Sequence, residues 1–255
     1  MTTMTPSNKA LIVPDWPVPL KVRALQTTRL GGVSRSPYAS LNLGDHVGDD
    51  RSAVAANRAL LRESLAGGGE PVWLEQVHGT RVVEAASLSP GDRPAQADAS
   101  FSREKGVVCT VMTADCLPVL FCDDVGSVVA AAHAGWRGLL AGVLEETVAA
   151  MAVPANALLA YLGPAIGPRA FEVGDEVRSA FVATDAALAA AFKPALPGKW
   201  LADLYLLARL RLGRLGVSRI YGGTFCTHSD ADRFFSYRRD GQTGRMASLI
   251  WLAPD

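Results

Sequence analysis

The chain lacks an excess of charge of either sign. Its 255 residues hold 25 lysine and arginine residues against 25 aspartate and glutamate residues. Without a basic stripe or an acidic tail, the composition speaks against a nucleic-acid-binding protein. Residues 1–17 have neither a charged start nor a long apolar run, which fits neither a signal peptide nor a membrane span. We therefore expect no nucleic-acid or membrane partner, and no obligate protein partner is evident.

Cysteine is also scarce. The four cysteines stand at positions 109, 116, 122 and 226 and form no CxxC pair. That spacing does not suggest a secreted disulfide framework. We expect a reduced, cytoplasmic protein.

Apolar residues, in contrast, are plentiful. Hydrophobic residues make up 49% of the chain and include five tryptophans, which is enough for one domain with a sizeable core. No repeat or linker stands out, so we predict a single mixed α/β domain over residues 1–255. Apolar runs predict strands at 10–13, 22–28, 72–79, 81–85, 106–113, 117–122, 127–134, 157–163, 219–223 and 246–252. Helical spacing predicts helices from 49 or 50 to about 66, and at 136–151, 175–191 and 202–216.

The stretch from Thr113 to Gly138, TADCLPVLFCDDVGSVVAAAHAGWRG, dominates the pattern. Two apolar runs flank a short acidic turn, and the gap is too short for a crossover, so a hairpin is expected. A turn centred between Asp124 and Val125 would place Cys116 opposite His133. Opposed residues share one face of a sheet with Cβ atoms about 4.5–5.5 Å apart. A loop of odd length would separate the two faces.

Cys116, His133 and the upstream His78 form a plausible zinc set. A thiolate and two imidazoles leave the fourth position open for water, as catalytic zinc requires. Spacing alone is weak support, because most cysteines and histidines in such a chain are structural. Small residues beside both histidines, such as Gly79, favour a functional site, since they leave room at strand ends. Alternatively, Cys116 and His133 could act without a metal, as a thiol nucleophile and its base.

Other residues admit both functional and structural interpretations. Arg137 follows Trp136 at a predicted helix start, where an anion could bind. Arg238 and Arg239 resemble an anion clamp, although a turn between strands is the alternative. Histidines 46 and 228 are expected at the surface or behind the ligands, and cysteines 109 and 122 in the core.

Several long motifs in this order resemble the YfiH-type laccase-domain family. They are TTRLGGVS, SLNLGDHVGDD, LEQVHGT, TADCLP, AAHAGWRG, LGPAIGP and FFSYRRDGQTGR, and they extend from about residue 25 to the end. Members of that family are regarded as purine nucleoside phosphorylases and were formerly labelled multicopper polyphenol oxidases.

The resemblance implies an α+β fold of mixed β-sheets flanked by helices, distantly shared with toxin deamidases. It implies that His78, Cys116 and His133 bind a catalytic metal, usually zinc, with copper as the alternative. It also implies phosphorolysis of adenosine, inosine and methylthioadenosine to the free base and ribose 1-phosphate, together with adenosine deamination. Phosphate would need an arginine, and the candidates are Arg29, Arg137, Arg238 and Arg239. Asn42 and Asp45 are candidates for contacts with ribose.

Three rival functions stay open at this point. The first is a metal-free hydrolase or deamidase with Cys116 as nucleophile and His133 as base. The second is a copper-dependent phenol oxidase, which is disfavoured because four histidines cannot supply a trinuclear cluster and a separate copper. The third is a role in editing peptidoglycan precursors, which these residues do not predict.

Overall fold

The computed structural model describes residues 11–89 and 93–254. Residue 10, the predicted start of the first strand, lies outside them. The strands are β1 Leu11–Ile12, β2 Val22–Thr27, β3 Pro71–Val72, β4 Val82–Glu84, β5 Ala99–Ser102, β6 Val108–Thr113, β7 Leu117–Asp123, β8 Val129–Ala134, β9 Leu158–Leu162, β10 Glu172–Gly174, β11 Phe192–Pro194, β12 Lys199–Ala202, β13 Arg219–Gly222 and β14 Met246–Leu252. The helices are α1 Arg51–Glu63, α2 Trp136–Ala141, α3 Val143–Ala150, α4 Asp175–Thr184, α5 Leu204–Arg214 and α6 Tyr237–Asp240, with 3-10 turns at Ala85–Ser87, Ala155–Ala157 and Ala186–Ala191.

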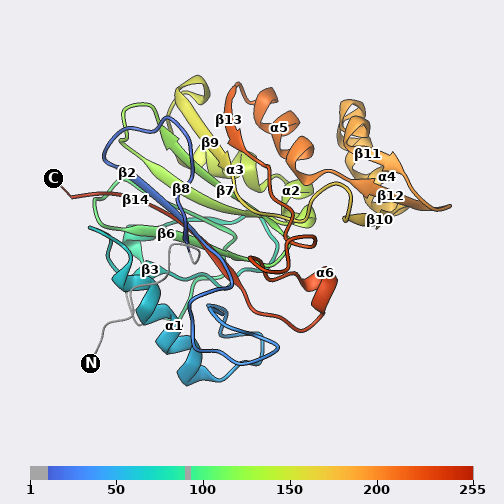
Figure 1. Ribbon diagram of the computed structural model, residues 1–255. Helices are drawn as coiled ribbons and strands as arrows, with labels where there is room; N and C mark the ends of the chain where they lie inside the picture. Colours follow the sequence, from blue (N-terminus) through green and yellow to red (C-terminus); the bar gives the residue numbers. More distant parts are fainter. Residues whose placement is uncertain (1–10, 90–92, 255) are drawn as a thin grey trace.

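Two mixed sheets form the centre of the molecule (Figure 1). One has the order β1-β2-β14-β6-β3 and the other β13-β9-β7-β8-β5-β4. The pairs β3–β6, β4–β5 and β13–β9 are parallel, and the remaining pairs in these sheets are antiparallel. The structure therefore confirms the predicted α+β fold of mixed sheets.

The buried side chains divide into layers. Alternate residues of β6 and β14, such as Val111 and Ile250, meet Leu120 and Val129 of the other sheet in one apolar cluster. The outer face of the six-stranded sheet packs against α2, α3 and α5, and the outer face of the five-stranded sheet packs against α1. Because both faces of the central strands are covered, β6 to β9 and β14 are buried along their whole length.

A small three-stranded sheet, β10-β12-β11, projects to one side together with α4 (Figure 1). The sequence predicted one helix over 175–191, but the α-helix ends at Thr184 and a 3-10 turn follows. Asp185, which is in extended backbone, caps this turn by accepting a hydrogen bond from Ala187 N. An aspartate that favours a cap thus ends the helix before the alanine run.

The helix predicted over 136–151 is also divided in two. Gly142 has a φ of 106°, and it ends α2 and begins α3. The apolar residues keep a helical spacing across the break because both helices bury them against the same sheet. The first helix agrees better with the prediction: it begins at Arg51, and Asp50 caps it by accepting from Ser52 N and Ala53 N.

The hairpin of β7 and β8 forms, but its register differs from the prediction by two residues. Pro118, rather than Cys116, lies opposite His133, and Cys122 lies opposite Val129. The turn is wider because the Asp123 carboxylate accepts hydrogen bonds from Ser127 N, Ser127 Oγ and Val128 N. A shift of two preserves the alternation of faces. Cys116 lies one residue before β7 begins, on the same side as His133.

Among the described residues, no helix has the length and apolar character needed to cross a membrane.

Candidate metal centre

Three segments bring His78, Cys116 and His133 together. His78 lies in the turn between β3 and β4, Cys116 immediately precedes β7, and His133 is the fifth residue of β8. One ligand atom from each residue lies within 4.8 Å of the other two. Cys116 Sγ is 3.9 Å from His78 Nε2, and the imidazole rings of His78 and His133 meet edge to face with centroids 4.8 Å apart. The site combines an exposed, a half-buried and a buried ligand residue, so it opens toward solvent on the His78 side.

A buried carboxylate holds two of these three residues in place. Asp98, which is fully buried, accepts a hydrogen bond at Oδ1 from His133 Nδ1 (2.8 Å) and another from the His78 backbone N–H (2.9 Å). Its Oδ2 accepts from the backbone N–H groups of Val77 and Gly79. The His78 backbone has a φ of 60°, which is unusual for a histidine. Asp98 stabilises that turn and directs Nε2 of His133 away from itself, toward Cys116.

Gly135 leaves the room in which the ligands converge. A Cβ atom built on Gly135 would lie 2.8 Å from Cys116 Sγ and 3.1 Å from His78 Cδ2. Contacts of that length require a neighbour to move. Since Gly135 also caps α2, the end of β8 and the start of the helix are fixed at this point. The sequence AHAGWRG thus gives one ligand and the space for the other two.

The electrostatics favour a thiolate at Cys116. Burial opposes ionisation of the Cys116 thiol, but the neighbouring His133 and His78 outweigh it and lower the Cys116 pKa to about 6. Burial lowers the pKa of His133, whereas Cys116 and Asp98 raise it, with a net value of about 9. The Asp98 pKa is lowered, because its hydrogen bond and its attraction to His133 outweigh the burial of the carboxyl group. At neutral pH without metal, the site is therefore a thiolate beside an imidazolium.

These residues fit a bound metal ion. Thiolate and imidazole are the ligands that zinc prefers, and ligands at zinc's usual bond lengths lie about 3.6 Å apart in a tetrahedron, close to the 3.9 Å between Sγ and His78 Nε2. Because Nδ1 of His133 is occupied by Asp98, its Nε2 is the atom left to bind the ion. The ion's identity does not follow from this geometry alone.

A cavity of about 310 Å³ opens beside the three ligands. It is lined by His46, Gln76, His78, Met112, Thr113, Ala114, Cys116, His133, Tyr237 and Arg245. A further cavity adjoins it and shares His46, Tyr237 and Arg245. The loop 28–50, α6 and the segment before β14 therefore line the site together with β6, β8 and the residues between β6 and β7.

Three of the residues proposed for phosphate or ribose have structural partners. Arg29 donates to the backbone carbonyls of Ala39 and Ala231. Asn42 is fully buried, and its side chain holds Gly44 and the Arg245 backbone N–H. Asp45 is exposed, 3.5 Å from the Arg58 guanidinium. None of the three is among the residues lining the ligand cavity.

The remaining predicted arginines also lie outside the ligand cavity. Arg137 is exposed and stacks over the Trp136 ring at 4.4 Å. Arg238 donates to the Glu172 carbonyl. Arg239 donates to the carbonyls of Thr227, His228 and Phe234 and pairs with Asp240, so it holds the C-terminal loop together rather than forming a clamp.

Several residues at the site were not singled out by the sequence. Asp98 sits in ADAS, where an acid among small residues was the available signal. Arg245 and Tyr237 belong to the motif that contains Arg238 and Arg239, and they line the ligand cavity whereas those two arginines do not. Asp115 directly precedes Cys116 and has a φ of 90°. Its carboxylate connects Cys116 to the C-terminal motif, because it accepts hydrogen bonds from Thr227 Oγ1, Ser236 Oγ and Arg238 N.

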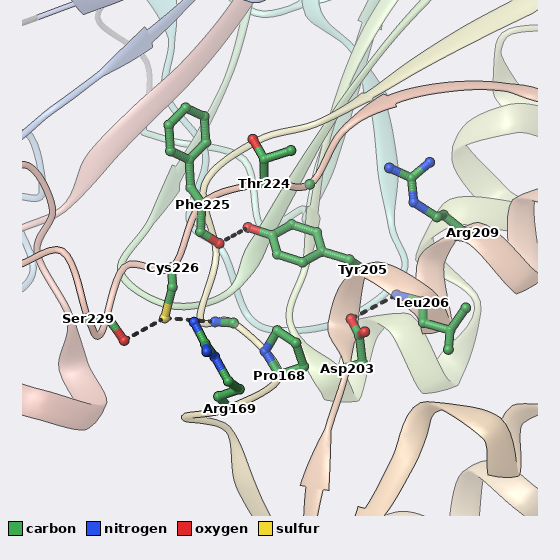
Figure 2. A pocket seen from close by; sticks show the side chains of 12 residues that line it. Pro168, Arg169, Asp203, Tyr205, Leu206, Arg209, Thr224, Phe225, Cys226 and Ser229 are labelled. Atoms are coloured by element: carbon green, nitrogen blue, oxygen red, sulfur yellow. Dashed lines mark hydrogen bonds between the residues drawn. The ribbon is translucent and has the colours of Figure 1, made fainter.

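A second cavity, of about 440 Å³, lies between the 167–169 loop, α5 and residues 223–229 (Figure 2). Several of its polar groups have partners within the chain. Tyr205 Oη bonds with Phe225 O at 2.9 Å, and Cys226 Sγ accepts from Gly167 N at 3.2 Å. None of the three clustered ligands is among its lining residues, so the smaller cavity is the candidate active site.

Comparison with known proteins identifies the family of this chain. Residues 23–253 match the family model described as multi-copper polyphenol oxidoreductase laccase. A Pseudomonas aeruginosa protein named purine nucleoside phosphorylase PA4543 is 60% identical over 95% of this chain and 98% of its own length. The Escherichia coli purine nucleoside phosphorylase YfiH is 57% identical over the same shares. The crystal structure of Neisseria meningitidis protein NMB0706 has a TM-score of 0.93 and 55% identity, covering 96% of this chain and 100% of that one. The chain belongs to this laccase-like family, whose relatives here are named purine nucleoside phosphorylases.

Proposed function

We propose that this chain is a zinc-dependent purine nucleoside phosphorylase. It would convert adenosine, inosine and methylthioadenosine to the free base and ribose 1-phosphate, and it would also deaminate adenosine to inosine. The observation that carries the proposal is the convergence of His78, Cys116 and His133 at a cavity. The names of the relatives support the phosphorylase activity.

The reaction balances without a redox partner. In phosphorolysis, a phosphate oxygen bonds to ribose C1′, the C1′–N9 bond breaks, and its electron pair leaves with the base, which takes up a proton at nitrogen. In deamination, water adds at C6 of the purine and ammonia leaves. When bound, zinc supplies a Lewis acid at the reacting group.

The side chains of this protein position and polarise the reactants. Asp98 fixes the His133 ring, so Nε2 faces the cavity in one orientation. The cavity volume of about 310 Å³ is at the lower end of the range for small-molecule sites, about 300–1,000 Å³. Tyr237 stands at the cavity wall with 62% of its surface exposed, which suits stacking on a purine.

The test is incubation with adenosine and phosphate, with adenine, inosine and ribose 1-phosphate followed separately. Wild type should form all three products, and His78→Ala should form none at a comparable rate. Metal analysis should find about one zinc per chain, which Cys116→Ala loses, and copper in its place would correct the choice of ion. Wild type that carries zinc but turns over no nucleoside with phosphate present would refute the proposal.

One observation favours a second candidate, a metal-free cysteine hydrolase or deamidase. Cys116 and His133 form a thiolate–imidazolium pair oriented by Asp98, the arrangement of a cysteine nucleophile and its base. In chelator-treated protein, iodoacetamide should alkylate Cys116 with a midpoint near pH 6, since the thiolate is the reactive form. If metal-free protein keeps full activity and alkylation abolishes it, the hydrolase is favoured over the phosphorylase.

A further inference from the structure

The cavity beside His78, Cys116 and His133 contains one arginine that forms no ion pair among the described residues. Among the residues that the structure describes, Arg245 is the arginine lining this cavity, and no carboxylate forms an ion pair with it. Its Nη1 donates to the carbonyls of Thr243 and Gly244, both at 3.0 Å. Its Nε and Nη2 make no hydrogen bond within the described part of the chain. A half-buried guanidinium with two free N–H edges is a ready receptor for an anion.

Asp115 attracts the Arg245 guanidinium through its charge but forms no ion pair with it. Both of its oxygens are occupied, Oδ1 by Thr227 Oγ1 at 2.6 Å and Oδ2 by Ser236 Oγ and Arg238 N. Asp45, on the neighbouring loop, pairs with Arg58. Arg245 therefore faces the cavity without an ion-paired carboxylate, although the charges of Cys116 and Asp115 attract it.

Two buried hydroxyls belong to residues that line the same cavities as Arg245. Thr113 lines the ligand cavity and is 2% exposed, and Thr243 lines the adjoining cavity and is 1% exposed. The Oγ1 atom of each has no hydrogen-bond partner. Buried hydroxyls are normally paired, and leaving one unpaired is unfavourable. Two such groups at neighbouring cavities indicate a missing ligand with oxygen acceptors.

The strand pairing brings these groups to one place. Thr113 ends β6 and is opposite Met246, the first residue of β14, so Arg245 lies next to Thr113 across the strand ends. Thr243 is two residues before Arg245, and its backbone carbonyl accepts a hydrogen bond from the Arg245 guanidinium. Cys116 follows Thr113 by three residues and lines the same cavity.

We infer that Arg245, Thr113 and Thr243 form the oxyanion site that binds inorganic phosphate beside the metal centre. The inference rests on the proposed phosphorylase function for its choice of phosphate among oxyanions. Arg245 offers paired N–H groups to two phosphate oxygens, and each threonine offers one O–H donor. It replaces Arg29, Arg137, Arg238 and Arg239 as the phosphate arginine, because those residues lie outside the cavity lining.

The test measures phosphate use and phosphate binding separately. In phosphorolysis, Arg245→Gln should raise the KM for phosphate by about 10- to 100-fold, the range for a lost charge-assisted hydrogen bond. Its rate of adenosine deamination, which needs no phosphate, should fall less than its rate of phosphorolysis. Arg51→Gln, an exposed arginine at the start of α1, is the matched control and should change neither quantity.

Thr113→Val and Thr243→Val make the test independent of the folding of Arg245→Gln. Since each hydroxyl lacks a partner, valine should leave the melting temperature unchanged or raise it, while the KM for phosphate rises by about 3- to 10-fold. A purely structural threonine would instead lower the melting temperature.

Calorimetric titration with inorganic phosphate separates this inference from the proposed function. If wild type binds phosphate, Arg245→Gln does not, and no phosphorolysis is seen, the site stands and the phosphorylase fails. If phosphorolysis is seen and both Arg245→Gln and the valine variants keep the wild-type KM for phosphate, the site is wrong. Wild type that binds no phosphate also overturns the inference.

Discussion

At the scale of single residues, Asp98 organises the site more than any ligand does. It accepts four hydrogen bonds, from His133 Nδ1 and from three consecutive backbone N–H groups at residues 77–79. One carboxylate thus sets the ring orientation of His133 and the unusual backbone of His78. Its charge also strengthens His133 as a hydrogen-bond donor at Nδ1 and as a ligand at Nε2.

Asp98→Asn should weaken metal binding by about 10- to 100-fold, the usual cost of losing the partner behind a metal-binding histidine. The amide keeps the shape of the side chain but lacks the negative charge, and one of its two positions is a donor rather than an acceptor. Competition with a chromogenic chelator measures the affinity. Glu84→Gln, at the exposed end of β4, is the control and should bind metal as wild type does. Unchanged affinity in Asp98→Asn would show that the carboxylate only stabilises the turn.

The sequence identified the ligand types but not the residues that support them. His78, Cys116 and His133 stood out because cysteine and histidine are rare in this chain and because small residues follow both histidines. Asp98 and Arg245 did not, because their roles depend on contacts across 35 residues to His133 and 203 residues to Asn42. Conversely, the adjacent Arg238 made Arg239 resemble part of an anion clamp. In the structure, the Arg239 guanidinium donates hydrogen bonds to three backbone carbonyls.

At the scale of elements, periodicity predicted which segments are strands and helices but not where they break. The apolar spacing through 136–151 has the period of a helix on both sides of Gly142, so it carries no sign of the break. The β7–β8 register shifted because the Asp123 side chain organises a wider turn, a local contact that residue counting omits. Both deviations come from single residues whose backbone or side chain competes with regular structure.

Gly142→Ala and Gly213→Ala should change stability in opposite directions. Gly142 has a φ of 106°, so alanine there should destabilise the protein by about 1–2 kcal/mol despite its higher helix propensity. Gly213 lies within α5 in ordinary helical backbone, and a Cβ there would meet nothing within 4 Å. Alanine at 213 should therefore stabilise by about 0.5 kcal/mol. Urea unfolding measures both changes. Equal effects of the two substitutions would mean that the α2–α3 break does not depend on the glycine.

At the scale of the molecule, the site joins the layers of the fold. His133 and Cys116 belong to the six-stranded sheet, Thr113 and Arg245 lie at the end of the five-stranded sheet, and the 28–50 loop adds His46. Asp115 links the start of β7 to the loop that contains α6. A ligand bound there contacts both sheets, so its binding energy should be coupled to unfolding of the whole chain.

Zinc should therefore raise the unfolding temperature of the metal-free protein in a single transition. A ligand at 100 times its dissociation constant adds about 2.7 kcal/mol to the free energy of unfolding. For a chain of this length, that corresponds to about 5–10 °C. Scanning calorimetry with and without zinc measures the shift, and His78→Ala, which lacks one ligand, should show a smaller one. The three clustered residues come from the segment before β7, from β8 and from the turn before β4. If the chain is a single domain, zinc should therefore shift the whole unfolding peak to higher temperature. Two separable transitions, with zinc moving only one, would divide the chain into independent units and contradict the single domain that the sequence predicts.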